Sequence, residues 1–312
     1  MLIRSLIDSI QEKQSPIVVG LDPRLGQIPD TIKSKYFKTY GKTFKAAAEA
    51  IVEFNMVIID AVADIVPAVK PQVAFYEQYG IEGLEAYKRT CDYAQEKGLI
   101  VVGDIKRGDI GSTSDAYADG HLGETEVEGE KHNAFSVDMV TVNPYLGDDS
   151  LKSFADRIEA HDKGMFVLVK TSNPTSSQLQ NLKVDGKTIY EIVAGMVDDW
   201  TEKTDQYKGY SPIGAVVGAT YPEESVKLRK LMPKAYFLVP GYGAQGATGK
   251  DITGCFNEDG FGAIVNSSRG IIFAYQKEAY KGMSVGDAAR KAVEDMKLDI
   301  NKALEDAGKR YW

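Results

Sequence analysis

The chain has 312 residues, with 43% hydrophobic and 26% charged side chains and a formal net charge of -8. This composition is typical of a globular protein with a substantial apolar core, and it argues against an intrinsically disordered chain. The acidic balance also argues against broad binding to nucleic acid or to an anionic membrane, because both need a basic surface field. Any phosphate group would therefore have to be bound locally.

The first expected element is a helix within residues 1–14, "MLIRSLIDSIQEKQ", where apolar residues recur at helical spacing. A signal peptide would instead carry an unbroken apolar core, and no stretch of the chain approaches transmembrane length. We therefore interpret this segment as an amphipathic helix rather than as a targeting sequence.

Short apolar runs with helical patterns between them occupy most of the chain. Segments 41–64, 79–98 and 186–203 carry apolar residues at three- and four-residue spacing, which predicts amphipathic helices. The apolar runs are interpreted as strands. These runs are "PIVVGLD" (16–22), "IVPAVKP" (65–71), "LIVVGDIK" (99–106), "DMVTVNP" (138–144), "MFVLVKT" (165–171), "PIGAVVGAT" (212–220), "AYFLVPG" (235–241) and "FGAIVNSS" (261–268).

Alternation of apolar strands with helices predicts a parallel sheet that is buried on both faces. Eight such units over about 250 residues favour the α/β class and a closed (β/α)₈ TIM barrel. An open doubly wound sheet is the alternative, because periodicity does not show closure. We expect residues 1–312 to form a single barrel domain with loop insertions near 22–41, 119–137 and 205–212.

The cysteines and histidines form no pattern typical of a metal or redox site. Cys91 and Cys255 lack the CxxC spacing and are too far apart in sequence to suggest a disulfide framework, so a reducing cytoplasm is expected. The three histidines show no metal-binding spacing, and no metal site is predicted from them. They are His121, His132 and His161.

Charged and small polar residues cluster at the carboxyl ends of the predicted strands. In a (β/α)₈ barrel the active site is built at this end. Repetition of polar residues from strand to strand is what packing alone would not predict. The residues are Asp22, Lys70, Asp104, Lys106, Asn143, Lys170, Ser172 and Arg269.

The segment "GDIKRGDIGST" places two carboxylates and an ammonium close together. Asp104 and Lys106 are two positions apart, so on an extended strand both face the barrel mouth while Ile105 faces the helices. A structural ion pair at a strand end is the alternative. The further charged residues Asp109 and Lys70, expected nearby, argue against a simple pair. Because carboxylates flank Lys106, its ammonium should stay protonated, which favours a proton donor over a Schiff-base nucleophile.

A second cluster joins "VPGYGAQGATGKD" (239–251) to "VNSSRG" (265–270). Small residues let backbone N–H groups approach an anion, Gln245 adds a side-chain donor, and Arg269 can bind phosphate oxygens in a bidentate manner. The first stretch follows the seventh strand and the second follows the eighth, which is the usual phosphate position of such barrels. A glycine-rich turn with a surface arginine is the alternative for either stretch alone.

Two further motifs have structural as well as functional interpretations. In "VKTSNP", Lys170 fits a structural ion pair as well as a ligand contact. The aromatic residues of "FYEQYG" (75–80) favour packing between loop and helix over a stacking platform.

These motifs together resemble those of the orotidine 5'-phosphate decarboxylase family. "DIKRGDIGST" is similar to the family signature D-x-K-x-x-D-I-x-x-T, and the bacterial type 2 branch is the most similar, with KPQ-A-FYE-YG after the second strand and K-TSNP after the fifth. The resemblance extends from "VGLDPR" (19–24) to "NSSRGI" (266–271) and is weakest around 119–137.

The resemblance implies a (β/α)₈ homodimer that converts orotidine 5'-monophosphate to uridine 5'-monophosphate and carbon dioxide without a cofactor or metal. Each motif position then has an implied role. Asp22 and Lys70 would contact the ribose hydroxyls, with Lys70 also ordering the charge array. Asp104 would lie near the substrate carboxylate, Lys106 would deliver the proton to C6, Asp109 and Thr113 would reach the neighbouring subunit's site, Ser172 would bind the pyrimidine, and Gln245 with Arg269 would hold the phosphate.

Two alternatives remain from the residues. A magnesium-dependent sugar-phosphate lyase on the same barrel would need a second carboxylate beside Asp104, and Glu77, the nearest in sequence, lies beyond its strand. A non-catalytic nucleotide-binding protein would explain the phosphate site and leave the D-x-K-x-x-D array unexplained.

Overall fold

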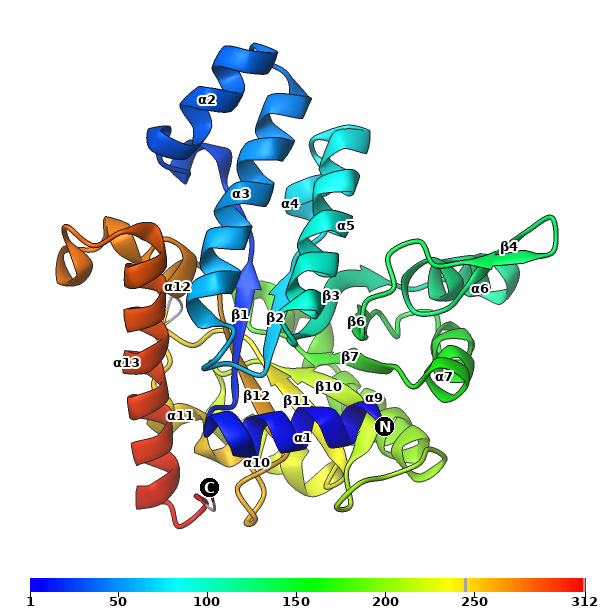
Figure 1. Cartoon of the computed structure of the whole chain (residues 1–312). Coiled ribbons are helices and arrows are strands. Elements are labelled where there is room, and N and C mark those ends of the chain that lie inside the picture. Colours follow the sequence, from blue (N-terminus) through cyan, green and yellow to red (C-terminus); the bar gives the residue numbers. More distant parts are fainter. Residues whose placement is uncertain (244–245, 311) are drawn as a thin grey trace.

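A closed barrel of parallel strands forms the centre of the molecule (Figure 1). The computed structural model describes residues 1–243, 246–310 and 312. Within them the barrel order is β1-β12-β11-β10-β7-β6-β3-β2, and pairing of β1 with both β2 and β12 closes it. The strands are β1 (Ile17–Leu21), β2 (Ala68–Pro71), β3 (Ile100–Arg107), β6 (Met139–Val142), β7 (Gly164–Lys170), β10 (Ser211–Val217), β11 (Ala235–Val239) and β12 (Ala263–Ser267).

This closure confirms the predicted (β/α)₈ barrel and rules out the open doubly wound sheet. Each of the eight apolar runs contains all, or all but one residue, of one barrel strand. Alternation along a strand divides the core into two clusters: in β1, Val18 faces the barrel interior while Ile17, Val19 and Leu21 pack against the helices.

Helices surround the barrel and include those expected from the sequence. The longer ones are α1 (Leu2–Lys13), α2 (Asp30–Tyr40), α3 (Phe44–Val62), α5 (Gly80–Glu96), α6 (Gly111–His121), α7 (Asp149–His161), α9 (Ile189–Glu202), α10 (Pro222–Leu231) and α13 (Val285–Asp306). Single-turn helices are α4 (Ala74–Glu77), α8 (Ser177–Gln180), α11 (Gly249–Ile252) and α12 (Arg269–Ile272).

Helix α1 covers the amino end of the barrel, opposite the strand ends at which the sequence predicts the site residues. Its buried face is the apolar stripe seen in the sequence, which packs on interior residues including Val18 and Phe166. Figure 1 shows this helix lying across the amino ends of the strands. The other end of the barrel is thus left as the open mouth.

Side-chain caps fix the starts of two of these helices. Thr43 accepts the amide of Ala46 at the start of α3, and Thr188 with Glu191 forms a capping box at the start of α9. Such caps satisfy amides that have no partner inside the helix.

The three segments expected to depart from the barrel pattern contain small elements. Segment 22–41 includes α2, and segment 119–137 includes the hairpin of β4 (Thr125–Val127) and β5 (Glu130–His132), which projects from the barrel in Figure 1. Segment 205–212 contains the Tyr207–Tyr210 bridge. A second small hairpin pairs β8 (Lys183–Val184) with β9 (Lys187–Thr188).

No helix in the described part of the chain has both the length and the apolar character needed to cross a membrane.

Candidate active site

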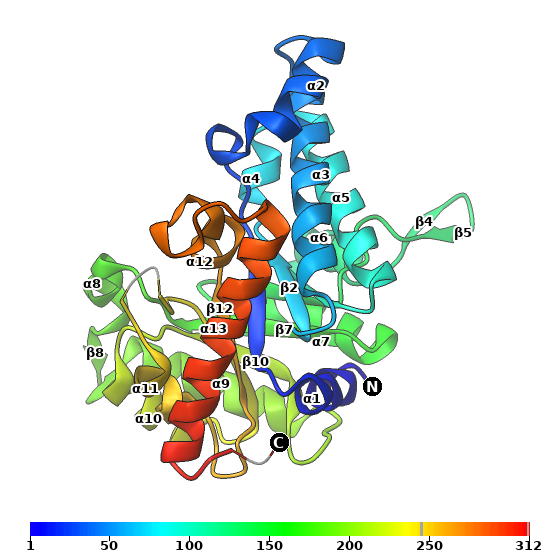
Figure 2. The ribbon, with the colours of Figure 1, turned by 60° about the vertical axis from the view of Figure 1, so that its left-hand side comes forward.

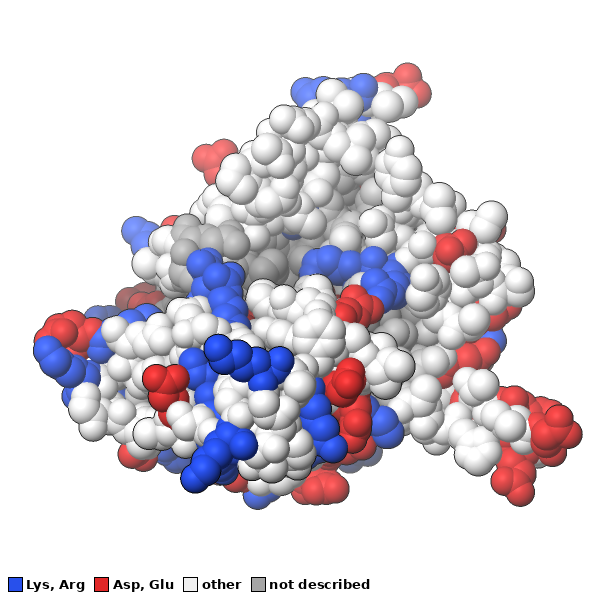
Figure 3. All heavy atoms as spheres, turned by 90° about the horizontal axis from the view of Figure 1, so that it is seen from above, with Lys and Arg blue, Asp and Glu red and all other residues white. Residues whose placement is uncertain are grey.

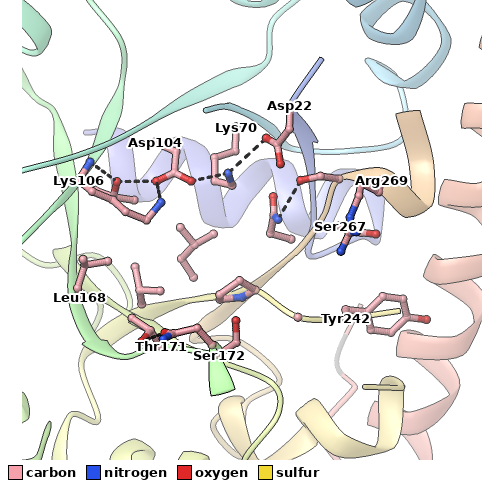
Figure 4. A pocket seen from close by; sticks show the side chains of 18 residues that line it. Asp22, Lys70, Asp104, Lys106, Leu168, Thr171, Ser172, Tyr242, Ser267 and Arg269 are labelled. Carbon is pink, nitrogen blue, oxygen red and sulfur yellow. Dashed lines mark hydrogen bonds and ion pairs between the residues drawn. The ribbon is translucent and has the colours of Figure 1, made fainter. Parts of the chain in front are cut away.

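A pocket of about 440 Å³ opens at the carboxyl ends of the barrel strands. Figure 3 shows this face hollowed, with Lys and Arg side chains at the hollow, and Figure 4 shows the pocket itself. The structure brings six of the predicted site residues together here: Asp22, Lys70, Asp104, Lys106, Ser172 and Arg269. They come from strands far apart in sequence because all carboxyl ends of a parallel barrel meet at one rim.

Asp104 is the centre of an array of alternating charges (Figure 4). Its Oδ2 lies 2.7 Å from the Lys70 ammonium, and its Oδ1 lies 2.5 Å from the Lys106 ammonium. Lys70 also faces Asp22, with 3.9 Å between Nζ and Oδ1. The hydroxyl of Thr141 donates to Asp104 Oδ1 over 2.8 Å. Both carboxylate oxygens of Asp104 are therefore held by donors.

Burial and neighbouring charges shift the pKa values of Asp104 and Lys70 in opposite directions. Asp104 is only 6% exposed, and burial alone would raise the pKa of its carboxyl. The ammoniums of Lys70 and Lys106 outweigh burial and hold that pKa well below its usual range. Burial would likewise lower the pKa of Lys70, but Asp104 and Asp22 raise it. The buried pair is therefore charged at neutral pH.

Lys106 has the more exposed side chain of the two lysines in this array, and its backbone is unusual. Its side chain is 45% exposed, in contrast to Lys70, and it lies in the left-handed region with φ of 47°. The pairing of β3 with β6 is irregular between Gly103 and Arg107. The regular extended backbone expected from Asp104 to Lys106 is thus broken at Lys106, within β3, although both side chains still reach the pocket. Left-handed backbone at a non-glycine residue is strained and is often found at functional sites.

Lys106 is supported by the neighbouring strand. Its backbone N–H donates to the Thr141 hydroxyl over 3.0 Å, and the same hydroxyl donates to Asp104. Ile105 is buried in the outer core cluster, as expected from alternation. One threonine therefore orients both the carboxylate and the backbone of the lysine.

Arg269 lies at the opposite side of the pocket, at the start of α12. It also borders an adjoining cavity of about 500 Å³. In the described residues no carboxylate lies within ion-pair distance of its guanidinium, and its side chain is exposed. Gln245, the other predicted phosphate ligand, lies outside the described residues.

Close approach of β1 to the segment before α12 requires a glycine. A β-carbon on Gly20 would lie 1.8 Å from the Ser268 hydroxyl oxygen. This contact keeps Ser268, and Arg269 after it, against the end of β1.

Asp109 and Thr113 do not line the pocket of their own chain. Asp109 is half-buried and its Oδ1 accepts the amide of Ile110 over 2.8 Å, while Thr113 is exposed on α6. The predicted roles of these two residues depend on a second subunit.

For two motifs with more than one interpretation, the structure shows which interpretation fits. Lys170 does not line the pocket; its ammonium lies 3.5 Å from Glu224 Oε2, which matches the structural ion pair. In "FYEQYG", Tyr76 is buried and donates to the Leu21 carbonyl, which matches the packing interpretation. Glu77 pairs with Arg107 and is not part of the pocket, so it does not supply the second carboxylate that a magnesium site beside Asp104 would need.

Thr141 and Asn266 are among the pocket residues that were not identified from the sequence. Thr141 lies in "MVTVNP", where a threonine inside an apolar run also fits β-propensity. Asn266 lies in "AIVNSS" and keeps its buried Oδ1 without a hydrogen-bond partner. A polar residue at an inward position of a buried strand was the available indication for both.

Comparisons with known proteins agree with this geometry. The profile of the Orotidine 5'-phosphate decarboxylase / HUMPS family matches residues 15–283. An orotidine 5'-phosphate decarboxylase of Rhodopirellula baltica is 45% identical over 287 residues, covering 92% of this chain and 93% of the relative. One of Petrotoga mobilis is 45% identical over 302 residues, covering 96% and 98%. The solved OMP decarboxylase of Leishmania donovani is 29% identical with a TM-score of 0.71, covering 95% of this chain and 99% of that structure. The chain belongs to the Orotidine 5'-phosphate decarboxylase / HUMPS family.

Proposed function

We propose that this protein is an orotidine 5'-phosphate decarboxylase, which converts orotidine 5'-monophosphate to uridine 5'-monophosphate and carbon dioxide in de novo pyrimidine biosynthesis. The observation that carries the proposal is the Asp22–Lys70–Asp104–Lys106 array at the barrel mouth. It offers a fixed, accessible ammonium next to a buried carboxylate. Close relatives over nearly the whole chain support the substrate.

Substrate binding spreads over the pocket. Arg269 and Gln245 hold the phosphate, and Asp22 with Lys70 contacts the ribose hydroxyls. Ser172, across the pocket, binds the pyrimidine ring. The exposed Arg269 guanidinium, which no described carboxylate neutralises, suits a dianionic phosphate.

The chemical step uses the charge of Lys106. When the bond between C6 and the carboxylate breaks, carbon dioxide leaves and the electron pair stays on C6. A fixed ammonium stabilises charge concentrated at C6 more than it stabilises the delocalised carboxylate, so it favours the transition state. Lys106 Nζ then gives its proton to C6, which completes uridine 5'-monophosphate.

Asp104 and Lys70 prepare this step. The depressed pKa keeps Asp104 ionised, so its charge opposes the substrate carboxylate that lies beside it. Phosphate binding through Arg269, away from the reacting carbon, offsets that repulsion. Lys70 holds Asp104 in place from the side away from Lys106.

The proposed enzyme is a homodimer in which Asp109 and Thr113 of each subunit reach the neighbouring site. Exposed apolar side chains beside them support an interface at this rim: Ile110, Tyr145 and Leu146. Gly108 packs on the Asn143 carbonyl, which keeps these segments adjacent.

The reaction as proposed needs no cofactor or metal, since it involves no redox change and the proton comes from a side chain. We further propose that the chain works as a single domain in the cytoplasm. Both cysteines are free buried thiols, which suits a reducing compartment.

Incubation with orotidine 5'-monophosphate tests the proposal. The ultraviolet absorbance of the substrate should fall with turnover and carbon dioxide should be released, with and without a chelator. The variant Lys13→Met should retain this activity. It changes a lysine that donates to the backbone carbonyls of Ala63 and Val66, away from the pocket. Binding of uridine 5'-monophosphate without turnover would instead identify a nucleotide-binding protein.

A further inference from the structure

Lys170 is a buried cation that the proposed reaction does not use. It is the last residue of β7 and is 1% exposed. Its ammonium donates to Asn181 Oδ1 over 2.7 Å and to Ser176 Oγ over 3.4 Å, and it lies 3.5 Å from Glu224 Oε2. A buried lysine is costly unless paired, so these contacts require explanation.

An irregularity in the sheet turns this lysine away from the pocket. Leu168 lines the pocket, so simple alternation would also point residue 170 inward. Val216 pairs with Leu168, but Val217 pairs with Lys170, so the register shifts by one residue at Val169. Lys170 therefore faces the helix layer, where its ammonium lies 4.6 Å from the Tyr221 ring centroid.

The groups that Lys170 contacts lie in one chain segment and in the helix next to it. Asn181 and Ser176 are in the segment 171–181, which leaves β7 and contains α8, and Glu224 is in the first turn of α10. Asn181 also donates to Glu224 over 3.4 Å. Figure 2 shows α8 and β8 on the same side of the barrel as α10. The ammonium thus ties the far end of the segment to a helix.

The near end of the same segment carries pocket residues. Thr171, Ser172 and Asn173 all line the pocket. The Thr171 amide donates to Gln180 Oε1 over 3.0 Å, and Gln180 donates back to the Thr171 hydroxyl over 2.8 Å. A displacement at Asn181 is therefore transmitted through Gln180 to the start of the segment.

Ser172 is also held against β10. The Gly218 amide donates to the Lys170 carbonyl over 2.8 Å. A β-carbon on Gly218 would lie within 2.9 Å of Ser172 backbone atoms, so the two chains are in direct contact. The position of Ser172 depends on how residues 170 and 181 are fixed.

We propose that Lys170 is a positioning residue that sets Ser172 at the pocket by tying the segment 171–181 to α10. This rests on the proposed function only where Ser172 is said to bind the pyrimidine. The segment itself is held by contacts within the free chain.

Hydrogen exchange tests the hold on the segment without any substrate. In Lys170→Met, amide exchange of peptides spanning 171–182 should rise by roughly 10-fold or more, because the segment opens locally. Asn181→Ala should also raise the exchange of these peptides. Because Asn181 is exposed, this variant should fold even if Lys170→Met, which changes a buried residue, does not. Lys13→Met is the matched control and should leave these peptides unchanged.

A double-mutant cycle tests the link to Ser172. Ser172→Ala should reduce kcat/KM in the wild type, and in the Lys170→Met background its further effect should shrink by roughly 5-fold or more, because coupled residues are not additive. In the Lys13→Met background the effect of Ser172→Ala should be unchanged. A purely structural role for Lys170 would give additive effects.

Two results would overturn the proposal: unchanged exchange of 171–182 in both Lys170→Met and Asn181→Ala, or additive kinetics with a full effect of Ser172→Ala in the Lys170→Met background. If the wild type does not decarboxylate orotidine 5'-monophosphate, the proposed function fails, and the exchange measurement alone decides whether Lys170 holds the segment.

Discussion

Two buried lysines at the rim of the same barrel have opposite surroundings. Lys70 on β2 faces the pocket and is paired with Asp104 and Asp22, whereas Lys170 on β7 faces the helix layer and is paired with Glu224. Both are almost fully buried, at 4% and 1% exposure. Residue type and strand-end position are therefore shared, and the side of the sheet differs.

Irregular pairing accounts for much of that difference. The register of β7 against β10 shifts just before Lys170 and turns it outward, whereas Lys70 keeps a regular register with Gly20 of β1 and faces the pocket. The face that a strand-end lysine occupies is thus decided by the last pair of the ladder, where alternation stops being a guide.

The largest effect should come from removing the pocket ammonium. Lys106→Ala should lower kcat by roughly 10⁴-fold, since it removes the proton donor. Binding of uridine 5'-monophosphate should be largely retained, because Arg269 and Ser172 are untouched. Single-turnover kinetics and calorimetric titration measure the two quantities. Lys170→Met should keep far more activity than Lys106→Ala. Equal losses of kcat in the two variants would contradict the different roles of the pocket side and the helix-layer side.

The pocket side should extend into a second subunit. Lys106→Ala and Asp109→Ala chains should each be nearly inactive, and a mixture should regain activity, because one site of a mixed dimer has both groups. Activity after subunit exchange, verified by mass spectrometry of the mixed species, provides the measurement. Absence of recovery would confine the site to one chain.

The stability of the two ion pairs should also differ. Asp104→Asn leaves Lys70 buried without its main partner and should lower the free energy of unfolding by about 3–5 kcal/mol. Glu224→Gln leaves Lys170 with Asn181 and Ser176, so a loss of about 1 kcal/mol is expected. Urea denaturation gives both values, and a reversed order would mean that the helix-layer pair carries more of the fold.

Acid should affect the pocket pair in a defined direction. An unfolded aspartate has a pKa of about 3.9, and the folded pKa of Asp104 is held below its usual range by the two lysines against the opposing effect of burial. Below about pH 4 the unfolded chain therefore binds a proton that the folded chain does not, so this contribution to stability is lost as pH falls through the folded pKa. Asp104→Asn should show a shallower fall in unfolding free energy over this range. Parallel pH profiles for the two proteins would contradict it.

Much of the fold could be predicted because strand and helix periods differ. All eight apolar runs became barrel strands, but closure depends on the β1–β12 pairing between distant segments, which periodicity does not report. Asp22, Lys70, Asp104 and Lys106 could be grouped because parallel strands end at one rim.

The remaining parts of the site depend on geometry that has no local pattern. Thr141 looked like an ordinary strand residue, and its role appears only when β6 is placed beside β3. The pairing of Lys170 with Glu224 joins two separate strand–helix units, and the register shift that makes it possible leaves no mark on the composition of β7.

The pairing of the first barrel strand with the last has a consequence for synthesis. Asp22 follows β1 and Arg269 follows β12, so neighbouring walls of one pocket are translated at opposite ends of the barrel sequence. A growing chain therefore has no complete binding site until Arg269 has left the ribosome. Substrate can then stabilise only a nearly finished molecule, and a chain stalled before β12 would expose the unpaired edge of β1 instead.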